Sequence, residues 1–210
     1  MSVRLRWLAR QFARPSGLAG RLLIAPWLDR ISRRANRLAL ERLAPAPGER
    51  VLELGFGGGG LLGLVLQSKL AKLIAVDASR AMVRRAARRF AASVSSDRLE
   101  LLHARAEALP LGGGSIDAAV SVSSLYFWDD LHRALTELAR VLRPGGRLVL
   151  VWEAPETLRR WPGHRFGFHI YDDASVIAAA AGANLLDPVV RSVDGFLVLS
   201  LRRGADMEGA

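Results

Sequence analysis

Residues 51–60, VLELGFGGGG, carry the pattern that most strongly indicates the fold. An apolar strand pattern carrying Glu53 runs directly into glycines at positions 55 and 57–60. A strand that breaks into a glycine-rich turn and then a helix lets the backbone approach a ligand closely, because no Cβ stands in the way. A second strand, 73–76, ends in Asp77 at the spacing typical of a βαβ unit whose acidic residue contacts a ribose. Both features favour a ligand that contains a nucleoside.

Strand and helix patterns alternate through the rest of the chain. Strands are expected at 51–54, 73–76, 99–103, 116–122 and 147–152, and helices at 58–69, 79–93, 130–142 and 173–182. The segment 143–146 reads as a turn, and Asp194-Gly195 reads as the turn of a closing hairpin between strands 188–193 and 196–202. This pattern predicts an α/β fold with a doubly wound, mostly parallel, seven-stranded Rossmann-like sheet and a C-terminal antiparallel hairpin.

Composition narrows the class of protein. Half of the 210 residues are apolar, so one domain can fold by burial, and the absence of cysteine excludes disulfides, thiolate metal sites and a cysteine nucleophile. No stretch approaches the roughly 20 apolar residues of a membrane-spanning helix, and we expect a cytoplasmic protein. The net charge of +10 comes from arginines spread along the whole chain. Such spreading favours a compositional preference for arginine over a nucleic-acid or anionic-membrane partner.

Five ordered motifs give the chain a resemblance to a known family over residues 36–152. They are Glu53-Leu54-Gly55-Phe56-Gly57-Gly58-Gly59, Val76-Asp77-Ala78-Ser79, Ala106-Glu107-Ala108-Leu109-Pro110, Ile116-Asp117 with the strand to Ser121, and the run from Leu138 to Gly146. In this order they resemble the class I S-adenosylmethionine-dependent methyltransferases, especially the ubiquinone/menaquinone-methyltransferase-like branch. The resemblance implies S-adenosyl-L-methionine as cofactor. It implies cofactor contacts at Glu53, Gly55, Phe56, Gly57, Asp77, Ala78, Ala106, Glu107 and Ser121.

One position departs from the family pattern. The family often has an acidic residue before the Ala-Glu pair, where it can accept a hydrogen bond from the adenine amino group. This chain has Arg105 there, whose guanidinium is a donor with no acceptor. Either the backbone around Ala106 contacts the adenine, or Arg105 turns outward.

The glycine loop, Asp77 and Glu53 each have an alternative interpretation. The glycine loop also fits a nicotinamide-dinucleotide site, although the Pro-Gly-Gly turn before strand 147–152 and the terminal hairpin favour a methyltransferase. Asp77 could cap the following helix instead of binding a ribose. Glu53 either orients the loop amides or reaches the amino-acid end of the ligand through water.

The methyl acceptor is expected beyond the carboxyl ends of the strands. In the loop after strand 116–122, Ser124, Tyr126 and Trp128 are candidate acceptor contacts, and the alternative is a helix-capping loop with packed aromatics. The long connection from Glu153 to Asp172 adds Phe166 as a contact. His164 and His169 are candidate bases because imidazole titrates near neutrality. Tyr126 is the third candidate catalytic residue.

No metal site is expected, because four scattered histidines match no ligand pattern.

Residues 1–45 read as a helical segment ahead of the main domain, 46–210. Leu5, Leu8 and Phe12 have helical spacing, and within 28–43 the expected anchors are Ile31, Leu38 and Leu43. By resemblance to the family, 12–21 would be a lid or cap over the donor. The alternative is a basic amphipathic helix at a membrane surface, which would allow peripheral membrane contact and point to a lipid acceptor.

The predicted function is methyl transfer from S-adenosylmethionine to an oxygen, nitrogen or carbon of a small-molecule acceptor. The in-line displacement needs alignment more than a strong base, and a base helps only with a phenol, alcohol, acidic carbon or protonated amine. The alternatives are a nucleic-acid or membrane-lipid methyltransferase and a non-catalytic S-adenosylmethionine-binding protein. The nucleic-acid reading is disfavoured, because the chain has no Asn/Asp-Pro-Pro-Tyr motif and no cysteine.

Overall fold

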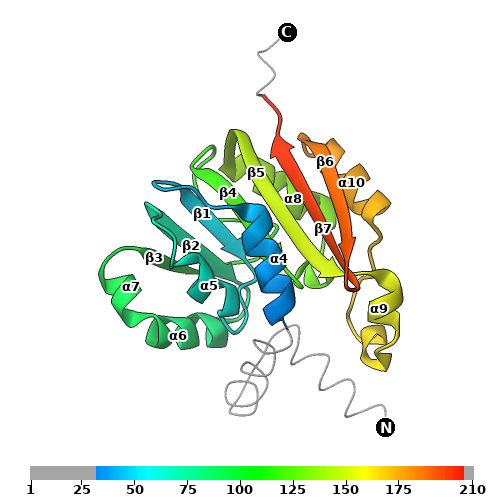
Figure 1. The fold of residues 1–210 in the computed structure, drawn as a ribbon, viewed down its shortest axis with the longest axis horizontal. Helices are drawn as coiled ribbons and strands as arrows, with labels where there is room; N and C mark the ends of the chain where they lie inside the picture. Colours follow the sequence, from blue (N-terminus) through cyan, green and yellow to red (C-terminus); the bar gives the residue numbers. More distant parts are fainter. Residues whose placement is uncertain (1–31, 206–210) are drawn as a thin grey trace.

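The computed structural model describes residues 32–205, so the predicted lid and the predicted membrane-surface helix lie outside the described residues. Seven strands form one sheet in the order β3-β2-β1-β4-β5-β7-β6 (Figure 1). They are β1 (Arg50–Leu54), β2 (Lys72–Asp77), β3 (Leu99–His103), β4 (Ile116–Val122), β5 (Leu142–Glu153), β6 (Leu185–Val193) and β7 (Phe196–Arg203). Neighbours are parallel except for β7, which is antiparallel to both β5 and β6. The predicted sheet and its closing hairpin are confirmed.

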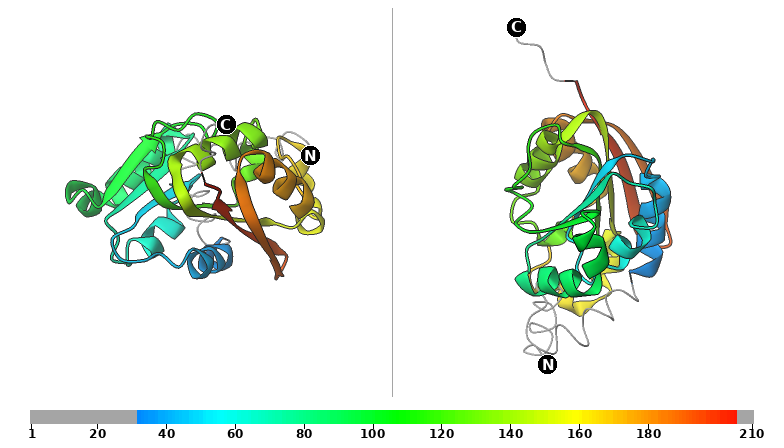
Figure 2. Two further views of the ribbon diagram at one scale, coloured as in Figure 1. Left: turned by 90° about the horizontal axis from the view of Figure 1, so that it is seen from above. Right: turned by 90° about the vertical axis from the view of Figure 1, so that its left-hand side faces the viewer.

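Helices cover both faces of this sheet. They are α4 (Arg33–Leu43), α5 (Gly60–Val65), α6 (Arg80–Arg89), α7 (Ala91–Ser95), α8 (Leu131–Val141), α9 (Pro155–Arg159) and α10 (Asp173–Gly182), with 3₁₀ turns η2 (Leu125–Phe127) and η3 (Pro162–Arg165). One buried cluster joins α4, α5 and α6 to the sheet, and a second joins α8 and α10 to its other face. Figure 2 shows α4 on one side of the sheet and α8 with α10 on the other.

The central strands are apolar on both faces because both faces are covered. In β5, Leu148, Leu150 and Trp152 belong to the cluster under α8 and α10, whereas Val149 and Val151 belong to the cluster under α4. All five are essentially inaccessible to solvent. The strand therefore reads as a continuous apolar run, and a charged residue at its end stands out.

Two local expectations need correction. The described anchors of α4 are Ala35, Ala39 and Leu43, while Leu38 is only partly buried; small residues let the helix approach the sheet closely. The predicted turn at 143–146 lies inside β5, since Ile116 pairs with Leu142 and Ala118 already pairs with Arg147. Residues 143–146 therefore bulge out of the strand pairing.

The strand order reverses between β1 and β4. From β1 the chain proceeds to β2 and β3 on one side, and from β4 to β5 on the other. At such a reversal the connecting loops diverge and leave a crevice beyond the carboxyl ends of the strands. The candidate site is expected in this crevice.

Arg147 fastens α4 to the start of the β5 pairing. Its guanidinium donates to both carboxylate oxygens of Glu49 at 2.6 Å and to the carbonyl oxygens of Leu43 (2.7 Å) and Ala44 (3.1 Å). The Arg147 hydrogen bonds hold the pKa of Glu49 below its usual value. A planar fork makes all of these bonds at once, which a lysine cannot do.

We expect Arg147→Lys to lower the free energy of unfolding by about 2 kcal/mol, because hydrogen bonds to charged groups are lost. A carboxyl with a lowered pKa stabilises the fold above its unfolded pKa of about 4.3, and this contribution disappears as the pH falls through the folded pKa. The gap between wild type and variant should therefore narrow below about pH 4. Urea unfolding at several pH values measures this difference in the free energy of unfolding, and Arg88→Lys on the exposed face of α6 is the control. Equal losses for both variants would contradict the assignment.

Candidate functional site

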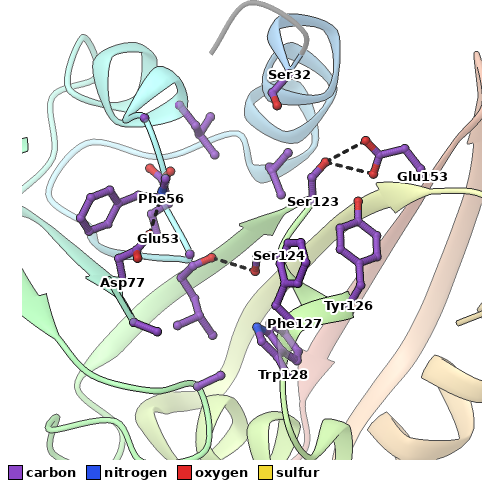
Figure 3. Close-up of a pocket in the computed structure, with 18 of the residues that line it drawn as sticks. Ser32, Glu53, Phe56, Asp77, Ser123, Ser124, Tyr126, Phe127, Trp128 and Glu153 are labelled. Atoms are coloured by element: carbon purple, nitrogen blue, oxygen red, sulfur yellow. Dashed lines mark hydrogen bonds between the residues drawn. The ribbon is translucent and has the colours of Figure 1, made fainter. Parts of the chain in front are cut away.

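A pocket of about 390 Å³ lies at the crevice between β1 and β4 (Figure 3). Its volume is within the range of roughly 300–1,000 Å³ typical of small-molecule sites. Its walls come from the glycine loop after β1, the end of β2, the segment 104–107 after β3, the segment 122–128 after β4, and the end of β5. Ser32 and Asn36 at the start of α4 also line it, and so do residues of the β5–α10 connection, namely Thr157, Leu158, Trp161 and Phe168.

The glycine loop needs its glycines at defined positions. A Cβ on Gly55 would lie 2.6 Å from the Ser124 side chain, and the φ of Gly55 is +77°, so only glycine fits there. Gly57 also has a positive φ, +50°, but a Cβ on it would meet nothing within 4 Å. Gly57 lines the pocket, so the space beside its Cα is available to a ligand. Glu53 and Phe56 line the same wall and are buried.

Asp77 joins the glycine loop to the end of β2. Its two carboxylate oxygens accept hydrogen bonds from the Gly57 and Ser79 backbone N–H groups, each at 2.8 Å. Burial raises the pKa of Asp77, and these hydrogen bonds oppose that shift. Ser79 is the N-cap of α6, but Asp77 bonds its N–H and also the glycine loop. Asp77 therefore does more than cap a helix.

The back of the glycine loop is held from α6. Arg85 and Arg89 donate to the Gly58 carbonyl oxygen at 2.9 and 2.8 Å. The Phe90 ring lies 3.0 Å from where a Cβ on Gly59 would stand. These contacts fix the loop from behind and leave its pocket side open.

The segment after β3 supplies a second wall. Ala78, Ala106 and Glu107, which are predicted cofactor contacts, line the pocket. A Glu107 oxygen accepts hydrogen bonds from the backbone N–H groups of Asp129 (2.6 Å) and Asp130 (3.3 Å). Arg105 forms ion pairs with Glu107 and Asp129, and its side chain is half exposed. Arg105, the residue that departs from the family pattern, therefore links this segment to the loop before α8 through its ion pair with Asp129.

Ser121, a predicted cofactor contact, does not line the pocket. Its buried hydroxyl donates to the Leu54 carbonyl oxygen at 2.9 Å and lies 2.6 Å from the Ser124 hydroxyl. The two serines join the ends of β1 and β4 beneath the site. Ser124, a predicted acceptor contact, does line the pocket.

The wall opposite the glycine loop is aromatic. Tyr126 and Trp128 line the pocket as expected, and Phe127, Trp161 and Phe168 join them. The Phe168 ring centroid lies 4.5 Å from that of Phe127, 5.2 Å from Trp161 and 5.5 Å from Tyr126. Phe166, the predicted contact, is not among the lining residues, and Phe168 takes that place. The Tyr126 hydroxyl is buried and has no hydrogen-bond partner within residues 32–205.

Neither candidate histidine lines the pocket. The Nδ1 atom of His164 lies 2.6 Å from the Trp161 carbonyl oxygen in η3. His169 is exposed, and its ring stacks on Tyr171. Both imidazoles therefore serve the connection between β5 and α10, away from the pocket wall.

This connection is anchored to η2 by its backbone. The His169 N–H donates to the Tyr126 carbonyl oxygen at 3.0 Å. The connection is therefore folded against the aromatic wall, and the pocket receives Trp161 and Phe168 from it. His164 and His169 were predicted as bases because segment 153–172 is rich in aromatic rings and imidazoles. That richness does not indicate which of its side chains point into the pocket.

Ser123 and Glu153 also line the pocket, although neither was predicted from the sequence. The Ser123 hydroxyl donates to the Glu153 carboxylate, at 3.3 and 3.2 Å from its two oxygens. Burial raises the pKa of Glu153, and hydrogen bonds from its own backbone N–H and from Ser123 oppose the shift. A charge at the carboxyl end of an otherwise apolar strand was the available signal.

The described residues hold neither a membrane-spanning helix nor a metal cluster. Within 32–205, no helix is both long enough and apolar enough to cross a membrane. In the same part of the chain, no three His, Cys, Asp or Glu side chains gather where they could hold a metal ion. The cytoplasmic location stays a prediction.

The strand order, the glycine loop and the carboxylate at the end of β2 define a Rossmann-like domain with its site at the strand reversal. Residues 52–150 match the family described as a methyltransferase domain. A solved structure described as a SAM-dependent methyltransferase from Aquifex aeolicus superimposes with a TM-score of 0.72 at 21% identity, covering 85% of this chain and 96% of that one.

Several curated relatives are named methyltransferases. An O-methyltransferase of Pyrenophora dematioidea is 31% identical over 142 residues, which are 63% of this chain and 53% of the relative. An uncharacterised methyltransferase of Mycobacterium bovis is 40% identical over 59% of this chain and 47% of its own length. The demethylmenaquinone methyltransferase of Clavibacter sepedonicus is 38% identical over 54% of this chain and 45% of its own. The chain spans about half the length of the curated relatives it matches.

By these matches, residues 52–150 are similar to methyltransferase domains, and the described fold is similar to that of the Aquifex aeolicus protein.

We expect Gly57→Ala to weaken binding of S-adenosylhomocysteine about tenfold or more, because the added methyl group would occupy space beside the loop that the nucleoside needs. Isothermal titration calorimetry measures the affinity. The substitution also strains the backbone by about 1–2 kcal/mol, because φ is positive.

Gly48→Ala is the matched control for that strain. Gly48 has a φ of +83°, and a Cβ on it would also meet nothing within 4 Å, but it does not line the pocket. Both variants should lose similar stability in urea, and only Gly57→Ala should lose affinity. Wild-type affinity in both variants would remove the glycine loop from the donor site.

Proposed function

We propose that this chain transfers a methyl group from S-adenosylmethionine to a hydroxyl oxygen of a small apolar molecule. The observation that carries the proposal is the pocket itself, which has open backbone and a carboxylate on one wall and aromatic rings on the other. The domain family supports methyl transfer. The relative named O-methyltransferase supports oxygen as the acceptor atom.

The donor side fits a sulfonium nucleoside. The Asp77 oxygens each accept one backbone hydrogen bond, and a carboxylate oxygen has a second lone pair that can accept from a ribose hydroxyl. Glu53, Gly55, Phe56 and Gly57 would lie along the donor, with Ala78, Ala106 and Glu107 beside its base. Ser121 would act only through Ser124 and the end of β1. When bound, the donor supplies an electrophilic methyl group.

The acceptor side offers surface that can orient the acceptor. Tyr126, Trp128 and Phe168 offer flat apolar surface, and Ser124 offers a hydroxyl at the floor. Holding the reacting atoms in line can contribute roughly 7–11 kcal/mol to lowering the barrier. For an acceptor of matching shape, most of the rate enhancement would therefore come from its orientation toward the methyl group. We include in the proposal that residues 12–21, within the N-terminal segment 1–45, form a lid over this pocket and that the reaction takes place in the cytoplasm.

Turnover of a compound panel tests the function. We expect release of S-adenosylhomocysteine and a methyl ether with phenols, and much less product with amines, quinone precursors or lipids. Mass spectrometry of both products gives the acceptor atom. Methylation confined to amines or to a ring carbon would contradict the oxygen assignment, and nucleoside binding without turnover of any compound would favour a non-catalytic binding protein.

Tyr126→Phe tests the acceptor wall. The hydroxyl is buried without a partner in the described part of the chain, so its removal should leave the thermal midpoint unchanged or raise it. If the hydroxyl meets the acceptor, KM for a phenol should rise several-fold while the affinity for S-adenosylhomocysteine stays the same. Tyr171→Phe, which removes the chain's other tyrosine hydroxyl outside the pocket, is the control. An unchanged KM in Tyr126→Phe would remove this contact.

A further inference from the structure

We propose that Glu153 is the catalytic base that takes the proton from the acceptor's hydroxyl group, with Ser123 and Tyr126 holding the reacting groups in place. This inference rests on the proposed function, because it concerns the same pocket and a hydroxyl acceptor. Three features support it: the position of Glu153, its lack of a cationic partner among the described residues, and the polar groups around it.

Glu153 is the last residue of β5 and lines the pocket. In the sheet order, β5 is next to β4 and is separated by it from β1, so Glu153 reaches the site from the side opposite Asp77. Figure 3 shows its carboxylate and the Tyr126 hydroxyl pointing toward the same part of the pocket, with Ser123 between the glycine loop and Glu153. The carboxylate therefore lies on the acceptor side.

Glu153 differs from Glu49, Asp117 and Glu137 in how it is paired. Glu49 is held by Arg147, Asp117 by Arg143 and Glu137 by Arg140, and each of these three has a lowered pKa. Among residues 32–205, no arginine or lysine forms an ion pair with Glu153, although the chain is rich in arginine. A carboxylate without a cation keeps its basicity.

Ser123, which donates a hydrogen bond to this carboxylate, has an unusual backbone conformation. Its φ is +49°, which costs free energy in a residue other than glycine and is typical of functional sites. The Ser123 N–H donates to the Val151 carbonyl oxygen at 2.8 Å, so the strained residue is fixed to β5. The Ser123 hydroxyl and the Glu153 backbone N–H donate one proton each, whereas the two carboxylate oxygens have about four lone pairs, so the carboxylate can still accept a proton.

The electrostatics of the pocket suit a base. Burial raises the pKa of Glu153, and no charged side chain of the described residues contributes to that shift. The other titratable side chains lining the pocket are Glu53, Asp77, Arg105, Glu107 and Tyr126. Figure 3 shows the Tyr126 hydroxyl pointing toward Glu153, whereas Glu53 and Asp77 lie across the pocket beside the glycine loop. A carboxylate with a raised pKa is a better proton acceptor than an ordinary one near neutral pH.

The reaction balances without another reactant. A lone pair of the hydroxyl oxygen forms the bond to the methyl carbon, and the carbon–sulfur electron pair goes to the sulfur, which loses its positive charge. The O–H bond breaks, and its proton goes to a Glu153 oxygen. The products are a methyl ether, S-adenosylhomocysteine and protonated Glu153, which then releases its proton to solvent.

Glu153→Gln tests the proposal with two readouts. The rate with a phenol should fall about 100-fold or more, while the affinity for S-adenosylhomocysteine stays within about twofold of wild type. The thermal midpoint at pH 8 should be equal or higher, because a raised folded pKa means that ionising Glu153 destabilises the fold above its unfolded pKa of about 4.3. This gain should vanish below about pH 4, where both states are protonated.

The matched control is Glu156→Gln, on the exposed side of α9 three residues along. It makes the same change of charge and should alter neither the rate nor the pH dependence of stability. A series from para-nitrophenol to para-methoxyphenol adds a third test. The rate of Glu153→Gln should depend on phenol acidity more steeply than the wild-type rate, because an acceptor that is already ionised needs no base.

The outcomes separate this inference from the proposed function. Wild-type turnover of phenols together with an unaffected rate in Glu153→Gln would overturn the base and leave the function standing. A midpoint at pH 8 well below that of wild type would mean a structural role and would also overturn it. Failure of the wild type to methylate any phenol would overturn the hydroxyl acceptor and the base with it.

Discussion

The two hydrogen bonds that the Asp77 carboxylate accepts from the Gly57 and Ser79 N–H groups tie the site together. They join the end of β2 to the glycine loop after β1 and to the start of α6. The arrangement buries a carboxylate, which raises its pKa and is costly for the fold alone. A ligand that uses the remaining lone pairs and the open side of the loop explains why such a group is kept there.

The pocket divides its chemistry between two walls. On the donor wall, the space beside Gly57 is open and Asp77 presents a carboxylate at the end of β2. On the acceptor wall, rings from the 122–128 segment and from the β5–α10 connection present apolar surface. Glu153 and Tyr126 are polar exceptions on that wall, and within residues 32–205 neither is paired with a cation. This contrast supports a specific role for each at the reacting atoms.

The fold was predictable because its signals are local. Alternating strand and helix patterns, the glycine loop and the Asp194-Gly195 turn each report their own structure, and the sheet order follows from the family resemblance. The acceptor side was harder to predict, because side-chain direction in irregular segments depends on tertiary packing. Phe168 lines the pocket where Phe166 was expected, neither candidate histidine lines it, and Glu153 carried no motif. Asp77 and Gly57 line the pocket, because each lies at or just after the end of a strand, and their contacts with a ligand stay predictions.

The central claim is that the nucleoside lies across the glycine loop with its ribose on Asp77 and its sulfur facing the aromatic wall. A crystal structure of the chain with S-adenosylhomocysteine tests it most directly. We predict ribose hydroxyls within hydrogen-bond distance of the Asp77 carboxylate and the sulfur exposed to the space beside Tyr126 and Glu153. A nucleoside bound elsewhere, or one whose sulfur faces away from that space, would contradict it.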